Sequence, residues 1–87
     1  MSSPVLMYTT AICPYCQMAR RLFQEKGAKY TEIRVDQNPG KRTEMMQKSG
    51  RRTVPQIWIG DTHVGGFDEA YALERTGKLD ALLKEQN

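Results

Sequence analysis

The chain contains two cysteines, and both lie in the run Cys13-Pro14-Tyr15-Cys16. Two thiols at this spacing can form and break a small disulfide. Residues 5–9, before the pair, have the composition of a β-strand, and residues 17–23, after it, have the pattern of a helix. We therefore expect reversible thiol–disulfide chemistry at a strand-to-helix junction.

Helix geometry predicts different roles for the two thiols. Pro favours the first position of a helix, so Pro14 at that position makes Cys13 the N-cap and Cys16 the third helical residue. The N-cap side chain faces unpaired backbone N–H groups, which together with the helix dipole stabilise a negatively charged sulfur. Since the thiolate is the attacking species, we predict that Cys13 is the nucleophile and Cys16 the resolving thiol.

Three other interpretations of the pair fit less well. A zinc site needs about four ligands, and the chain offers two cysteines, one histidine, His63, and carboxylates. A structural disulfide between Cys13 and Cys16 would close too small a loop to constrain the unfolded chain much. Two inert buried thiols are the third interpretation, but Pro14 and Tyr15 are poor companions in a core.

The remaining elements follow from periodicity, capping residues and turn signals. The first helix places four apolar residues on one face, Met18, Ala19, Leu22 and Phe23, and ends at Lys26-Gly27. After it we expect a strand over 30–35, a helix from Asn38-Pro39 to Gly50, and a hairpin of 56–59 and 62–64. A final helical region runs over 68–76, breaks at Gly77 and resumes at Leu79.

This order predicts an α/β fold with a mixed four-stranded sheet and helices on both faces. The first two strands are joined through a helix and should be parallel, whereas the last two form an antiparallel hairpin. Residues 1–87 are expected to form one domain. Cys13 would lie at the carboxyl end of the first strand, where open α/β sheets bind ligands.

Composition narrows the classes of partner. The net charge of +3 comes from 13 basic and 10 acidic residues, with basic residues concentrated at 41–42 and 48–52. These basic segments are short and have no interleaved aromatics, so we do not expect nucleic-acid binding. The remaining interpretations of the basic residues are a solvated protein face or a binding site for a small anion. With no membrane-length apolar stretch and no secretory pattern, we expect a cytoplasmic protein, in which a cysteine pair is more often catalytic than structural.

The segment Thr53-Val54-Pro55 precedes the third strand. A cis bond before Pro55 would turn Val54 outward and leave its N–H and C=O groups free. An extended peptide could then pair with Val54 as an added strand.

The segment Gly65-Gly66-Phe67-Asp68 opens the last helical region. The glycines allow positive φ and close approach by a ligand. The N–H groups of Phe67 and Asp68 could bind a carboxylate and the Asp68 side chain an ammonium, so that one α-amino acid zwitterion would satisfy both. The alternative is that Asp68 only complements the helix dipole.

Together, the motifs CPYC, TVPQI and GGFDE resemble those of the glutaredoxins, within the thioredoxin-like superfamily, and the resemblance covers nearly the whole chain. It implies a thioredoxin-like fold and a glutathione site. Cys13 would form the mixed disulfide with Tyr15 beside it, and Val54 would pair with the tripeptide between Thr53 and cis-Pro55. Gly66, Phe67 and Asp68 would hold the γ-glutamyl end. Arg42, or less favourably Arg51, would bind the glycine carboxylate.

The resemblance implies a glutathione-dependent thiol–disulfide oxidoreductase, without a metal, that acts as a monomer on protein disulfides and glutathione mixed disulfides. Glutathione would be regenerated by glutathione reductase and NADPH. The chain departs from the family at Thr10, where a Lys is usual, and at Phe67, where small relatives often carry Cys. Alternatives are a redoxin reduced by a flavoprotein reductase, an iron–sulfur carrier that uses Cys13 and glutathione, or a copper or zinc carrier. His63 is expected on the exposed strand of the hairpin.

Overall fold

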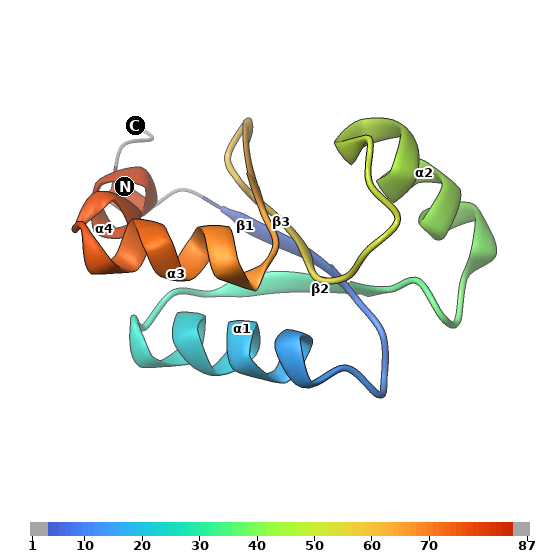
Figure 1. Cartoon of the computed structure of the whole chain (residues 1–87), viewed down its shortest axis with the longest axis horizontal. Coiled ribbons are helices and arrows are strands. Elements are labelled where there is room, and N and C mark those ends of the chain that lie inside the picture. Colours follow the sequence, from blue (N-terminus) through green and yellow to red (C-terminus); the bar gives the residue numbers. More distant parts are fainter. Residues whose placement is uncertain (1–3, 85–87) are drawn as a thin grey trace.

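The computed structural model describes residues 4–84 of the chain. Its elements follow the order β1 (Val5–Thr9), α1 (Pro14–Glu25), β2 (Tyr30–Arg34), α2 (Pro39–Ser49), β3 (Gln56–Ile59), β4 (Thr62–Gly65), α3 (Phe67–Arg75) and α4 (Lys78–Lys84) (Figure 1). This is the order that the sequence predicts, with the last helical region divided at Gly77.

The four strands form one mixed sheet in the order β2-β1-β3-β4. β1 pairs in parallel with β2, in a register that places Val5 opposite Tyr30. β3 is antiparallel to β1, with Val5 opposite Ile59, and β4 is antiparallel to β3. The parallel pair and the hairpin are therefore confirmed, and β1 is a central strand that ends beside the cysteine pair.

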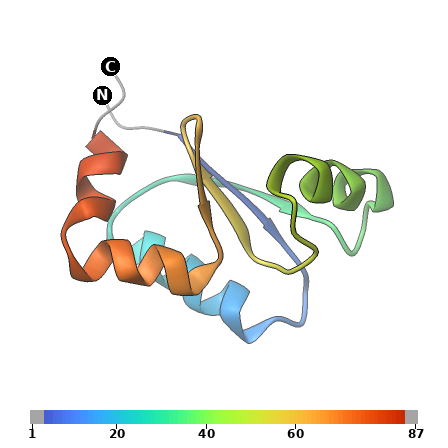
Figure 2. The ribbon, with the colours of Figure 1, turned by 45° about the horizontal axis from the view of Figure 1, so that its top comes forward.

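Helices cover both faces of the sheet, as expected. α1, α3 and α4 lie on one face and α2 lies on the other (Figure 2). The larger core lies under α1, α3 and α4 and includes Met7, Phe23, Ile57, Ala70 and Leu79, all with 0% exposure. The smaller core under α2 consists of Tyr8, Val35, Met45 and Trp58. Within residues 4–84 no helix is long and apolar enough to cross a membrane.

The predicted helix starts are confirmed by their capping bonds. Pro14 and Pro39 are the first residues of α1 and α2, where the missing N–H of proline costs nothing. The Asn38 side chain accepts a hydrogen bond from the Lys41 N–H at 3.3 Å. Gly27 follows α1 with a φ of +68°, the left-handed conformation expected after a helix.

The prediction that Met18 belongs to the buried face of α1 is wrong. The buried residues of α1 are Cys16, Ala19, Leu22 and Phe23, whereas Met18 is 41% exposed. A stripe through positions 16, 19 and 23 has its centre about 130° around the helix from residue 18. Met18 therefore lies on the flank of the helix, next to solvent.

Candidate active site

Cys13 is the N-cap of α1, in the position that the sequence predicts. Its backbone is extended, and its sulfur accepts a hydrogen bond from the Cys16 N–H at 3.1 Å. Cys13 is largely buried and keeps 8% exposure. An acceptor at this position is stabilised as an anion by the helix N-terminus. The local geometry therefore suits a sulfur that attacks another sulfur.

Cys16 lies one turn inside the helix and has 0% exposure. Burial raises the pKa of Cys16 to about 12, and hydrogen bonding to Cys13 contributes in the same direction. The Thr10 backbone and Arg20 act against this increase. Both cysteines are free thiols in the structure. Cys16 is thus held as a protonated thiol within reach of Cys13.

The segment before β3 meets the start of α1. The bond between Val54 and Pro55 is cis, as the resemblance to the glutaredoxins implies. The Cys13 Sγ lies 3.8 Å from the Val54 carbonyl oxygen, although the two residues are 41 positions apart. Pro55 is buried and Val54 is half-buried. The strand edge and the thiol are therefore neighbours.

A cavity of about 330 Å³ adjoins this contact, between α1, the segment before β3 and the start of α3. Its lining includes most of the predicted binding residues: Tyr15, Thr53, Val54, Pro55, Gly66, Phe67 and Asp68. The rings of Tyr15 and Phe67 lie 6.5 Å apart between centroids. The three segments that the sequence places far apart along the chain thus line one site.

Arg51 and Glu69 also line this cavity, whereas Arg42 does not. The Arg42 guanidinium is exposed and donates to the Arg52 carbonyl at 3.3 Å. Arg51, the less favoured candidate, forms an ion pair with Glu69 at 3.2 Å. The cation at the cavity is therefore Arg51, and a role for Arg42 toward a ligand stays a prediction.

Glu69 binds the backbone at the start of α3. Its Oε1 accepts from the Gly66 N–H at 2.7 Å, and this bond, with help from Arg51, holds the pKa of Glu69 below its usual value. Gly65 has a φ of +109°, whereas Gly66 has a negative φ. Of the two glycines, only Gly65 uses a backbone conformation that other residues rarely adopt.

The loop before Cys13 is held by residues that sequence reasoning missed. Asp36 accepts a hydrogen bond from the Ala11 N–H at 3.1 Å. Arg20 donates to the Thr10 carbonyl at 3.4 Å and pairs with Glu32 at 2.6 Å. Arg20 lies one helical turn beyond Cys16, and this spacing is the sequence signal that could have placed Arg20 near the cysteine pair. Thr10, which stands where the family usually has Lys, thus contacts a cation through its backbone.

His63 lies on the hairpin strand, as predicted, but it is less exposed than the surface residue that we expected. It is half-buried and stacks on Trp58 with 4.5 Å between ring centroids. Its Nε2 lies 2.8 Å from Oε1 of Gln56, which has 0% exposure. Burial and the nearby Arg51 hold the pKa of His63 below its usual value, with Glu69 acting in the opposite direction.

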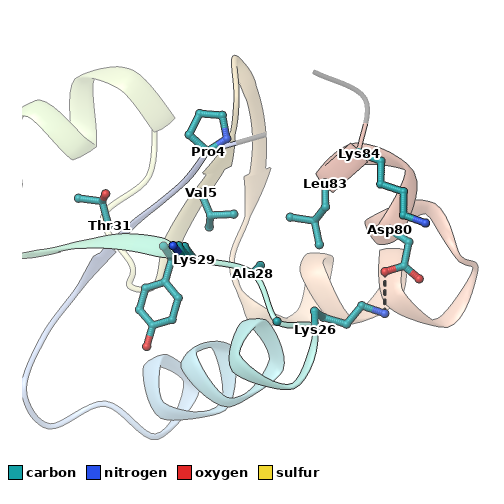
Figure 3. Close-up of a pocket in the computed structure, with 11 residues that line it drawn as sticks. Pro4, Val5, Lys26, Ala28, Lys29, Thr31, Asp80, Leu83 and Lys84 are labelled. Atoms are coloured by element: carbon teal, nitrogen blue, oxygen red, sulfur yellow. Dashed lines mark ion pairs between the residues drawn. The ribbon is translucent and has the colours of Figure 1, made fainter. Parts of the chain in front are cut away.

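A second cavity, of about 600 Å³, lies at the other end of β1 (Figure 3). Val5, Ala28 and Leu83 are among the residues that line it, and Lys26 there pairs with Asp80 at 2.8 Å. It contains neither cysteine and none of the predicted binding residues. Across residues 4–84, no group of three or more His, Cys, Asp or Glu side chains is placed to hold a metal.

The fold and the site together define a thioredoxin-like thiol–disulfide oxidoreductase. The family model described as Glutaredoxin matches residues 5–64. The glutaredoxin of Pseudomonas aeruginosa is 60% identical over 80 residues, covering 92% of this chain and 95% of that protein. Glutaredoxin 3 of Escherichia coli K12 is 50% identical, covering 92% and 96%.

Solved structures agree with these relatives. The solution structure of glutaredoxin from Brucella melitensis superposes with a TM-score of 0.85 at 52% identity, covering 95% of this chain and 90% of that one. A buckwheat glutaredoxin–glutathione complex gives 0.87 at 36% identity, covering 95% and 78%. The chain belongs to the glutaredoxin family.

Proposed function

We propose that this protein is a glutathione-dependent oxidoreductase that reduces glutathione mixed disulfides and protein disulfides through Cys13 and Cys16. The cavity beside Cys13 carries the proposal. It combines a strand edge at Val54, the helix start at Gly66 and Phe67, and the Asp68 carboxylate, which suit an extended peptide with a zwitterionic end. The buckwheat relative is a glutathione complex.

On glutathione mixed disulfides, the Cys13 thiolate attacks the glutathionyl sulfur. A Cys13–glutathione disulfide forms, and the substrate leaves as a thiolate that takes up a proton. A second glutathione, as its thiolate, then attacks this bond. Glutathione disulfide leaves and the Cys13 thiolate is regenerated, so the cycle converts one mixed disulfide and one glutathione into the free substrate thiol and glutathione disulfide.

On protein disulfides, the Cys13 thiolate attacks one substrate sulfur, so that a mixed disulfide forms, the substrate S–S bond breaks, and the other substrate sulfur leaves as a thiolate that takes up a proton. Cys16 loses its proton and attacks Cys13, which releases the second substrate thiol and leaves a Cys13–Cys16 disulfide. Two glutathione molecules reduce that disulfide, and glutathione reductase recycles them with NADPH. In this proposal the protein acts as a monomer in the cytoplasm.

Each predicted residue has a task in the bound state. The Val54 N–H and C=O pair with the tripeptide backbone, while Thr53 and Pro55 border it. The N–H groups of Phe67 and Asp68 bind the γ-glutamyl carboxylate, and the Asp68 side chain binds its ammonium. Tyr15 covers the disulfide. A guanidinium, Arg51 or Arg42, binds the glycine carboxylate.

The test is reduction of a small glutathione mixed disulfide, coupled to glutathione reductase, for three proteins. We expect activity in the wild type and in Cys16→Ser, because deglutathionylation uses one thiol. Cys13→Ser should be inactive. Activity in Cys13→Ser would refute the mechanism, and inactivity of the wild type would refute glutathione dependence.

A further inference from the structure

Gln56 is a buried polar residue whose hydrogen bonds point to the site. It is the first residue of β3, follows Pro55 directly and has 0% exposure. A buried amide without partners would be costly, so its bonds show what it is positioned to hold. Its Nε2 donates to the Thr53 carbonyl at 2.9 Å and contacts the Thr53 Oγ1 at 3.2 Å.

The Thr53 carbonyl determines the direction of the hydrogen bonds that run from His63 through Gln56 to Thr53. A carbonyl oxygen can only accept, so the amide nitrogen of Gln56 faces Thr53 and its oxygen faces His63. The 2.8 Å contact between Gln56 Oε1 and His63 Nε2 therefore requires the hydrogen of His63 on Nε2. The ring is fixed from its other side by Trp58, on which it stacks.

These bonds end on a segment that has no regular secondary structure. Residues 51–55 form neither helix nor strand, so side-chain bonds must define much of their position. Thr53 precedes Val54, whose carbonyl lies 3.8 Å from the Cys13 sulfur. A displaced Thr53 carbonyl would thus move the backbone groups beside the nucleophile.

We propose that His63 and Gln56 are positioning residues, whose hydrogen-bond relay to Thr53 holds the Val54 backbone where an extended disulfide substrate pairs with it. The inference rests on the proposed function, because it assumes that Val54 pairs with the glutathione backbone. Neither residue touches the substrate. Their contribution is to binding geometry, and the reactivity of the thiol is independent of them.

The experiment uses two variants that break the relay at different bonds. Gln56→Met fills a similar volume without polar atoms, and His63→Phe keeps a ring over Trp58 but removes the N–H. The double variant removes both polar side chains of the relay, and it leaves only the polar groups of Thr53, an exposed residue, to be hydrated by solvent. His63→Gln supplies another N–H donor as a rescue variant, and Thr62→Ala, at an exposed neighbouring position on β4, is the control.

We expect KM for a glutathione mixed disulfide to rise about five- to tenfold in each single variant, because this ratio corresponds to the net free energy of about one hydrogen bond. The kcat and the rate of Cys13 alkylation by iodoacetamide should change less than about twofold, on the same reasoning that the thiol is untouched. The double variant should stay impaired, while His63→Gln and Thr62→Ala should behave as the wild type. An unchanged KM with a lower melting temperature would show a structural role only and overturn the proposal.

Backbone dynamics provide a readout that does not need turnover. NMR order parameters of the Thr53 and Val54 amides should fall from about 0.85, typical of rigid backbone, toward 0.6 in Gln56→Met and His63→Phe. Unchanged values would overturn the inference. If the wild type lacks activity with glutathione, the proposed function fails, and this measurement still decides whether the relay positions Val54.

Discussion

Cys13 and Cys16 share one motif but differ in environment. Cys13 caps α1, accepts an N–H bond and keeps 8% exposure, whereas Cys16 has 0% exposure. Burial raises the pKa of Cys16 to about 12, so this thiol stays protonated near neutral pH. The two thiols therefore differ in chemistry because Cys16 lies about one helical turn further into the protein than Cys13.

The first prediction at this scale concerns alkylation. With substoichiometric iodoacetamide at pH 7, the label should appear on Cys13, because Cys16 is protonated and inaccessible. Peptide mass spectrometry measures the distribution, and labelling in denaturant, which should reach both thiols, is the control. Preferential labelling of Cys16 would contradict the assigned roles.

A second prediction concerns the carboxylate at the start of α3. Asp68→Asn should raise KM for glutathione about tenfold, since a charge-assisted hydrogen bond is worth about 1.5–3 kcal/mol. Coupled kinetics with glutathione reductase measure it. Asp61→Asn, at the exposed turn between β3 and β4, removes an equal charge and should leave KM unchanged. Equal effects of the two variants would show that only net charge matters.

At the scale of elements, the site depends on where helices begin. α1 starts at the cysteine motif. α3 starts at Phe67, just after Gly65 turns the chain from β4 toward the residues that line the cavity. Gly65 has a φ of +109°, and an added Cβ would lie 2.9 Å from the Glu69 Oε1. That oxygen accepts the Gly66 N–H, so the turn and the helix start depend on each other.

Two glycine substitutions should therefore have opposite signs. Gly65→Ala should destabilise the protein by about 1–3 kcal/mol, through backbone strain and displacement of Glu69. Gly40→Ala, inside α2, should stabilise it by about 0.5–1 kcal/mol, because alanine loses less backbone freedom in a helix. Urea unfolding gives both values. A neutral Gly65→Ala would show that the turn tolerates a side chain.

The whole molecule is linked by ion pairs between elements. Arg20 of α1 binds Glu32 of β2, and Lys26 at the end of α1 binds Glu74 and Asp80 of α3 and α4. Burial acts to raise the pKa of Glu32, but hydrogen bonds from Arg20 and Thr9 outweigh it and lower that pKa. The Glu32 carboxylate therefore binds fewer protons when the chain is folded.

Acid should consequently unfold this protein. The pKa values of Asp36, Glu44 and Glu69 are also lowered, chiefly by bonds from Arg34, Tyr8 and the Gly66 N–H. Their stabilisation is complete above the unfolded pKa of about 4 and is lost as pH falls through the lower folded values. Melting temperature against pH measures this. Glu32→Gln should melt lower than the wild type at pH 7 and show a shallower decline below pH 5.

The fold and the reactive pair could be predicted from the sequence because their signals are local. Pro14 after Cys13 and Pro39 after Asn38 mark helix starts through the geometry of proline and of the N-cap. Alternation and apolar spacing indicate the strands and helices within windows of a few residues. The motifs around Val54 and Asp68 resemble those of a family, and that resemblance is what assigns them to one site.

Tertiary structure alone decided which distant side chains meet. The relay from His63 to Thr53 depends on the register of β3 and β4, in which Trp58 lies opposite His63. Arg51 lines the cavity, whereas Arg42 binds the Arg52 carbonyl. The path of the segment after α2 determines which of the two arginines reaches the cavity. Local residue patterns specify where an element starts and ends. They do not specify side-chain contacts across a sheet, because those depend on how all the elements pack.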